Sequence, residues 1–176
     1  MAPMATTKEE CLQQMHAGFA EFDAVLAKLP RDRLTEPNAV GIWSIRDLLA
    51  HFAGYERYVA AEIMGTLTGQ PPTVQERYGR DDAPTPADEA NDDTTNAWVV
   101  AWGRRQTLES VLTQFAEAHY RLVAAVEACS EADLDEPGRF PWVSDGRTLA
   151  AILPNQCWQH HRDHLADVER WRASLG

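Results

Sequence analysis

Two histidines near the end of the sequence, His160 and His164, have the types and spacing that metal chemistry needs. They stand four residues apart in a stretch, residues 158–171, that lacks glycine and proline and consists of good helix formers. On a helix this spacing places both imidazoles on one side, about 6 Å apart along the axis. Because histidines at positions i and i+4 can bind one metal ion, the pair indicates a candidate metal site.

The pair also interrupts an apolar helical stripe. Steps of three or four residues join Leu153, Cys157, His160, His164, Val168 and Trp171. A buried polar atom without a partner costs about 1–3 kcal/mol, and metal binding would explain two titratable groups on such a stripe. Surface histidines, or core histidines bonded to carbonyls, are the alternative. His161 lies about 100° around the helix from His160, so it is expected to lie off the stripe without a role.

A third histidine, His51, belongs to the inward side of another predicted helix. That helix begins after Ser44 and Asp47, which resemble an N-terminal cap. Its apolar stripe consists of Ile45, Leu48, Phe52, Tyr55, Val59 and Ile63. His16 lies beside the stripe of the first predicted helix, as a flank residue. For His119, in the third long helix, spacing alone does not separate a ligand from a flank residue.

Four long amphipathic segments must position these histidines. They cover about residues 8–29, 45–63 and 107–128 and a last segment that begins near residue 148. Pro154 falls inside the last segment and predicts a kink rather than a break. A short apolar helix is expected over residues 95–102. Because no strand-like alternation occurs, the sequence predicts an all-α, up-down four-helix bundle with one long crossover loop and a short extra helix.

The crossover, residues 65–93, is rich in glycine, proline and acidic residues. A connection of this length usually forms a functional lid or a mobile segment, and a solvated acidic loop is an equal alternative. Trp98 needs an apolar surface, which would anchor the end of the crossover. We therefore expect residues 65–104 to form one wall of a pocket that Tyr55 and Trp98 line.

Composition favours one globular domain over residues 1–176. The chain is 44% hydrophobic with six tryptophans, which is enough for one core. A net charge of −11 disfavours nucleic acids and anionic membranes as partners, and no apolar run reaches the length of a membrane span. Three scattered cysteines without a C-x-x-C motif, and an N-terminus unlike a signal peptide, predict a reduced, cytoplasmic protein.

Two motifs resemble the DinB/YfiT-like superfamily of four-helix bundles. Residues 41–51 (GIWSIRDLLAH) are similar to its second-helix signature, and residues 160–168 (HHRDHLADV) to its final-helix H-x-x-x-H motif. Within the superfamily the chain looks most like the ClbS/DfsB branch, through residues 7–10, the segment around Asn96 and residues 130–134. The resemblance covers nearly the whole chain.

The resemblance implies a homodimeric bundle that holds one divalent metal ion with one histidine of the second helix and two of the last. Carried over by position, the metal ligands are His51, His160 and His164. Imidazole suits zinc, nickel and their neighbours, so ligand type does not select the ion. Tyr55 and His16 would face the same cavity and are the candidate catalytic residues.

Three histidine ligands leave coordination positions for water or a substrate thiol. A metal there lowers the pKa of water or stabilises a thiolate, which predicts a hydrolase or thiol-transferase that acts on a small electrophilic molecule in detoxification or self-protection. One alternative is a metal-free small-molecule binding protein or cyclopropane hydrolase, as the ClbS/DfsB branch implies. Another is a structural dimer without catalysis. Asp47 and Asp167, each one turn from a ligand, are candidates to orient the histidines.

Overall fold

The structure, a computed structural model, describes residues 7–176. Most of this part of the chain is helical, and its only β-type pairing is an isolated bridge between Val40 and Trp43, so the predicted all-α class is confirmed. A short 3-10 helix, Arg31–Arg33, lies between the first two α-helices. The α-helices are α1 (Lys8–Leu26), α2 (Ile45–Thr68), α3 (Val74–Tyr78), α4 (Asp92–Gly103), α5 (Leu108–Ala128), α6 (Glu131–Asp135), α7 (Leu149–Gln156) and α8 (Trp158–Ser174).

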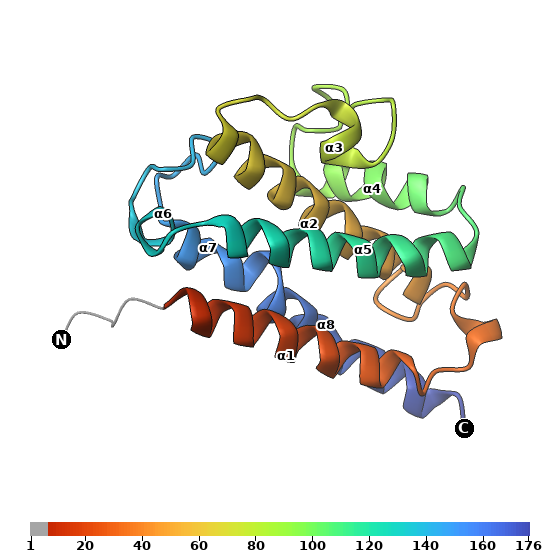
Figure 1. The fold of residues 1–176 in the computed structure, drawn as a ribbon. Coiled ribbons are helices and arrows are strands. Elements are labelled where there is room, and N and C mark those ends of the chain that lie inside the picture. The colour runs from red at the N-terminus through yellow and green to blue at the C-terminus, as the bar shows by residue number, and fades with distance from the viewer. Residues whose placement is uncertain (1–6) are drawn as a thin grey trace.

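The long helices form the predicted four-helix bundle (Figure 1). α2 packs along α5, α1 packs against α8, and α7 lies end to end with α8. The short helices α3 and α4 cover the outer side of α2, where the crossover between the second and third long helices returns along the bundle. The crossover therefore lies on the helix that carries His51.

Local capping explains where the helices begin. Thr7 and Ser44 each form a capping box, with Glu10 and Asp47 as the reciprocal partners. These side chains satisfy backbone N–H groups that have no partner inside the helix. α1 ends at Leu26, earlier than the predicted residue 29, because the next residues form tighter turns in which Leu29 N–H donates to the Leu26 carbonyl.

The fourth predicted helix is two helices, so the expectation of a kink without a break is wrong. α7 ends at Gln156, and Cys157 adopts φ −140° and ψ −101°, outside the helical region. Pro154 lies in the last turn of α7, three residues before the interruption, where it has no N–H to donate. The break lies just before His160 and His164 in α8.

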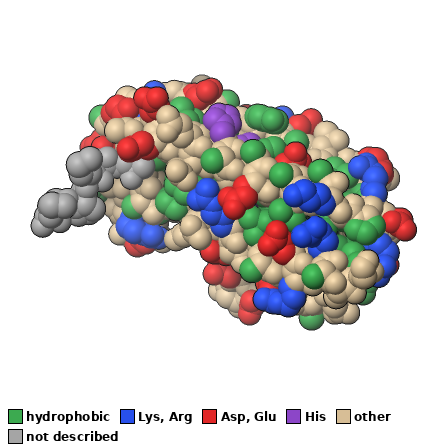
Figure 2. Space-filling view, turned by 90° about the horizontal axis from the view of Figure 1, so that it is seen from below, with side chains coloured by type: hydrophobic (Ala, Val, Ile, Leu, Met, Phe, Trp, Pro, Cys, Tyr) green, Lys and Arg blue, Asp and Glu red, His purple; other side chains and the backbone are tan. Residues whose placement is uncertain are grey.

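The surface that Figure 2 shows carries basic and acidic side chains interspersed over the same face. Histidine side chains, in purple, also reach the surface there. Among the described residues, no helix combines the length and the apolar character that crossing a membrane requires.

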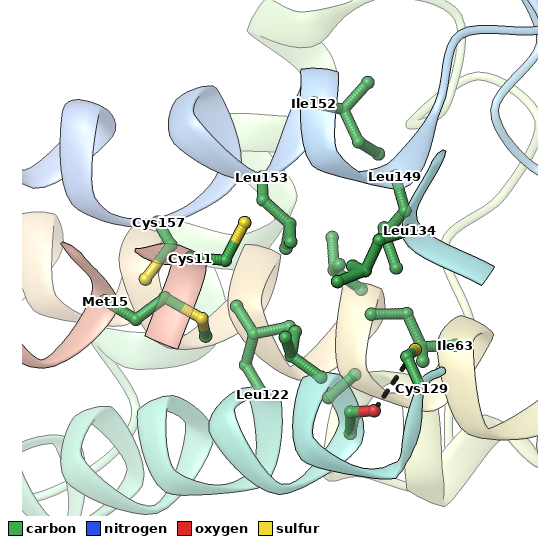
Figure 3. Packing of buried hydrophobic residues seen from close by; sticks show 14 of the residues in the cluster. Cys11, Met15, Ile63, Leu122, Cys129, Leu134, Leu149, Ile152, Leu153 and Cys157 are labelled. Carbon is green, nitrogen blue, oxygen red and sulfur yellow. Dashed lines mark hydrogen bonds between the residues drawn. The ribbon is translucent and has the colours of Figure 1, made fainter. Parts of the chain in front are cut away.

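The core contains all three cysteines of the sequence. Figure 3 shows Cys11 and Met15 from α1 facing the same interior as Cys157 from the α7–α8 junction. Cys129, at the end of α5, donates a hydrogen bond to the Ala125 carbonyl at 3.5 Å. Within residues 7–176 each cysteine is buried and none is joined to another.

Candidate metal centre

The structure brings together three of the candidate residues, His51 from α2 and His160 and His164 from α8. One ring nitrogen of each lies within 4.8 Å of the others. The Nε2 atoms of His51 and His160 are 2.8 Å apart, and the ring centroids of His160 and His164 are 5.3 Å apart. His51 is buried, whereas His160 and His164 are half-buried. His51 therefore lies on the inner side of the group, and His160 and His164 of α8 lie nearer the surface.

Aromatic packing holds these imidazoles in place. The ring of Phe52, which is fully buried, lies 5.0 Å from His160 and 5.6 Å from His164 between centroids. Trp43, just before α2, packs against His51 with the ring centroids 5.0 Å apart. The centre thus lies near the start of α2, as the position of His51 in that helix requires.

Asp47 fixes the start of α2 rather than a histidine. Its carboxylate accepts from the Ser44 N–H at 3.1 Å and from Nε and Nη2 of Arg104 at 3.0 and 2.8 Å. Arg104 follows α4, so the pair ties the end of α4 to the beginning of α2. This corrects the expectation that Asp47 orients a ligand. Asp167, the other candidate, contacts Arg170 at 2.5 Å.

Replacing Asp47 with asparagine should lower the free energy of unfolding at pH 7 by about 1–2 kcal/mol, because a buried charged cap and ion pair are lost. Burial raises the pKa of Asp47, but the hydrogen bonds from Arg104 and Ser44 outweigh it and hold the pKa below 3.8. A carboxyl group whose pKa is lowered by folding stabilises the folded protein at pH values above its unfolded-state pKa. That contribution disappears as the pH falls through the lowered, folded-state pKa. Urea unfolding of both proteins should therefore converge below about pH 4. A gap that persists in acid would contradict this role.

The electrostatics of the three histidines keep them neutral. Burial, then the charges of His160 and His164, lower the pKa of His51 to about 3. Burial, then His164, lowers the pKa of His160 to about 4. Burial also lowers the pKa of His164. At neutral pH the centre therefore offers three uncharged imidazoles, which is the protonation state in which histidine binds metals.

The donor set fits a divalent ion. The two Nε2 atoms at 2.8 Å can share one proton, or both can direct lone pairs at a cation in its place. Three imidazoles supply the nitrogen ligands that zinc, nickel and copper accept, and they leave at least one coordination position free.

Tyr55 connects the histidines to a pocket. Its ring lies 4.8 Å from that of His51, and its hydroxyl donates to Asn96 Oδ1 of α4 at 3.1 Å. The pocket has a volume of about 420 Å³. Its lining consists of Gly54, Tyr55, Tyr58, Tyr78, Pro84, Glu89, Thr95, Trp98 and Val99. Residues of the 65–104 segment line this pocket together with Tyr55 and Trp98, as predicted, but His51, His160 and His164 are not part of its lining. Asn96 is a contact that sequence spacing did not single out.

His16 does not join the histidine centre. It is exposed on α1, and its ring centroid lies 6.3 Å from that of His119. This corrects the expectation that it shares a cavity with Tyr55.

The structure assigns His161 and His119 to a second buried group, so the expectation that His161 has no role is wrong. His161 is fully buried, with Nε2 2.7 Å from Oε1 of Glu56. His119 is also fully buried, with Nδ1 3.3 Å from the other carboxylate oxygen. The missed sequence signal is Glu56 itself. It stands four residues after Phe52 on the apolar stripe of α2, where a charge requires a partner.

Comparison with known proteins agrees with this architecture. No curated protein matches the chain. An uncharacterised protein from Escherichia coli UTI89 shares the fold with a TM-score of 0.75 and 14% identity, over 97% of this chain and 95% of that one. DfsB, described as a sibling lethal factor precursor, gives a TM-score of 0.76 at 15% identity over 97% of both chains.

The colibactin self-resistance protein ClbS, solved in complex with a double-stranded DNA, gives a TM-score of 0.73 at 14% identity over 96% of both chains. The presence of ClbS and DfsB among these structures is consistent with the ClbS/DfsB branch. The sequence model of the DinB superfamily matches residues 14–168, which includes all three histidines of the centre. The chain therefore belongs to the DinB superfamily.

Proposed function

We propose that this protein is a divalent-metal-dependent enzyme, a hydrolase or thiol-transferase that acts on a small electrophilic molecule in detoxification or self-protection. The observation that carries the proposal is the convergence of His51, His160 and His164 from two helices. Tyr55 lies beside them and also lines the pocket of about 420 Å³. A cation site next to a pocket of this size suits a small-molecule reaction.

The three imidazoles would hold the ion, with zinc or nickel as the leading candidates. A bound ion there supplies a water of lowered pKa or a stabilised thiolate. Burial, then the charge of Asp92, raises the pKa of Tyr55 above 10.0, so its hydroxyl stays protonated at neutral pH. Asn96 fixes the direction of that hydroxyl. Tyr55 can therefore orient a substrate as a hydrogen-bond partner but does not act as an anionic base.

The pocket lining indicates the kind of substrate. Tyr58, Tyr78 and Trp98 provide aromatic surfaces, and Glu89 is the acidic group on the wall. Arg80 lies behind this wall with its guanidinium 4.0 Å from the centre of the Trp98 ring, which holds the indole in place. Such a lining favours a compact molecule with an apolar body and few polar groups.

The test is an activity assay on protein purified without a nickel column. The protein is stripped with a chelator, reloaded with zinc or nickel, and given a panel of epoxides and activated aryl halides, with and without a low-molecular-weight thiol. We expect consumption of an electrophile by the reloaded protein only, with Tyr55→Phe reducing the rate and the exposed His16→Ala leaving it unchanged. Dependence on the thiol identifies a transferase, and turnover without it a hydrolase. Equal rates for stripped and reloaded protein would contradict metal dependence.

A metal-free protein similar to ClbS and DfsB is the second candidate. The fold shared with both and the aromatic pocket favour it. In that case the stripped protein would bind or open a strained-ring electrophile as well as the reloaded protein does. The predicted homodimer is separate from this choice, and sedimentation analysis measures it directly. A dimer that lacks activity in every assay would support the purely structural alternative.

Duplex DNA is not expected to bind this chain, although a DNA complex is known for ClbS. The net charge is −11, and DNA affinity at physiological salt depends on clustered Lys and Arg. Electrophoretic mobility of a short duplex should remain unchanged at micromolar protein and 150 mM salt. A salt-sensitive shift would show that this expectation is wrong.

A further inference from the structure

A second group of metal-ligand side chains lies outside the histidine centre. Glu56 comes from α2, His119 from α5, and Cys157 from the break between α7 and α8. One ligand atom of each lies within 4.8 Å of the others. His119 Nδ1 is 3.3 Å from Glu56 Oε2 and 3.8 Å from Cys157 Sγ. Three separate elements of the bundle thus direct a carboxylate, an imidazole and a thiol at one point.

This group is sealed from solvent and incompletely paired. The exposed fraction is 1% for Glu56 and 0% for both His119 and Cys157. Both carboxylate oxygens are buried without a hydrogen bond of acceptable geometry, even though imidazole nitrogens lie 2.7 and 3.3 Å from the carboxylate. A buried charge is stable in a protein interior only when it is paired or coordinates a metal.

We propose that Glu56, His119 and Cys157 bind a second divalent metal ion, zinc or a cation of similar preferences, in a closed structural site. Zinc accepts these three ligand types, with bonds of about 2.0–2.2 Å to oxygen and nitrogen and about 2.3 Å to sulfur. Tetrahedral coordination with those bonds separates nitrogen from oxygen by about 3.3 Å and nitrogen from sulfur by about 3.6 Å. The observed separations of 3.3 and 3.8 Å match both values.

The charges also balance around a divalent ion. A carboxylate, a thiolate and a neutral imidazole carry two negative charges, which one divalent cation cancels in the buried space. Burial, then Glu56, raises the pKa of Cys157 well above 9.0, so the thiol is protonated unless a cation binds it. A thiol that coordinates a metal ion is deprotonated to the thiolate.

The surroundings support the ligands. His161 Nε2 lies 2.7 Å from Glu56 Oε1 and holds the carboxylate oxygen that faces away from His119. Phe19 stacks on the His119 imidazole at 4.1 Å between centroids, with a 12° angle between the rings. An ion here would join α2, α5 and the α7–α8 junction. It would thereby fix the break at Cys157, three residues before His160. The inference goes beyond the proposed function and does not depend on it.

Cobalt(II) tests the proposal, because a thiolate bound to cobalt gives a near-ultraviolet charge-transfer band that imidazole ligands do not give. Since the site is closed, the full-length protein is refolded with Co²⁺ present and then gel-filtered. We expect the band in the wild type. Cys157→Ser should lose both the band and one equivalent of bound cobalt. The matched control is Cys11→Ser, which is equally buried in the same core but has no histidine or acidic side chain in a ligand group with it. Cys11→Ser should keep the band.

His164→Ala separates the two centres. It should keep the thiolate band while losing the other equivalent of cobalt, so failure of the proposed histidine centre leaves this result unchanged. Glu56→Gln, which preserves the shape of the side chain, should lower cobalt affinity by at least about 10-fold. A folded wild type without the band would overturn the proposal and assign the group to an imidazolium–carboxylate network. The same conclusion follows if Cys157→Ser retains the band.

Discussion

Replacing His164 with alanine should lower the affinity of the histidine centre for a divalent metal by more than about 100-fold. Loss of a residue that only orients a ligand typically costs 10–100-fold in metal affinity, and loss of one of three direct ligands costs more. His164 is half-buried, so its truncation should leave the bundle folded. A competition titration of zinc against a chromophoric chelator, with circular dichroism to verify folding, measures the effect.

His16→Ala is the matched control, because it removes an exposed histidine from another helix. Its zinc affinity should equal that of the wild type. His161 is unsuitable as a control because it is fully buried against Glu56. Equal loss of metal from His16→Ala and His164→Ala would show that the ligand set is wrong.

The second large effect is expected at Phe52. Its ring is fully buried and lies 4.6–5.6 Å from the rings of the three histidines of α8. Phe52→Ala should lower the free energy of unfolding by about 3–5 kcal/mol, because a cavity replaces an aromatic ring. It should also lower zinc affinity at the histidine centre by at least about 10-fold, because the imidazoles lose the surface that orients them. Urea unfolding and the zinc titration measure the two effects separately.

Phe140→Ala provides a control of the same chemistry. Phe140 is 1% exposed and belongs to the core cluster at the other end of the bundle. Phe140→Ala should lower the free energy of unfolding by a similar amount, about 3–5 kcal/mol, yet leave zinc affinity unchanged. If both variants lose metal equally, general destabilisation explains the loss and Phe52 does not position the centre.

Local sequence signals were sufficient for most of the fold. The capping residues Thr7 and Ser44, the apolar periodicity of the long helices and the glycine- and proline-rich crossover are all short-range features. His160 and His164 were identifiable because their spacing equals one helical turn. His51 was identifiable because it lies on an apolar arc and matches the position of a family motif.

The remaining features depend on tertiary packing. His161 does not lie on the helical stripe that contains His160. One side of α8 packs against α1 and another side contributes to the shared core, so more than one stripe of α8 is buried. The break at Cys157 places the thiol beside His119, 38 residues away in sequence. Tyr55 and Asn96 are 41 residues apart and meet only because the crossover returns along α2. Helical periodicity carries no information about such pairings.

The most direct test of the metal centre is a crystal structure of the zinc-loaded protein, with anomalous diffraction measured above and below the zinc edge. We expect an anomalous peak about 2.0–2.1 Å from one nitrogen each of His51, His160 and His164. A well-occupied crystal without a peak among these three imidazoles, or with their rings directed into different compartments, would contradict it.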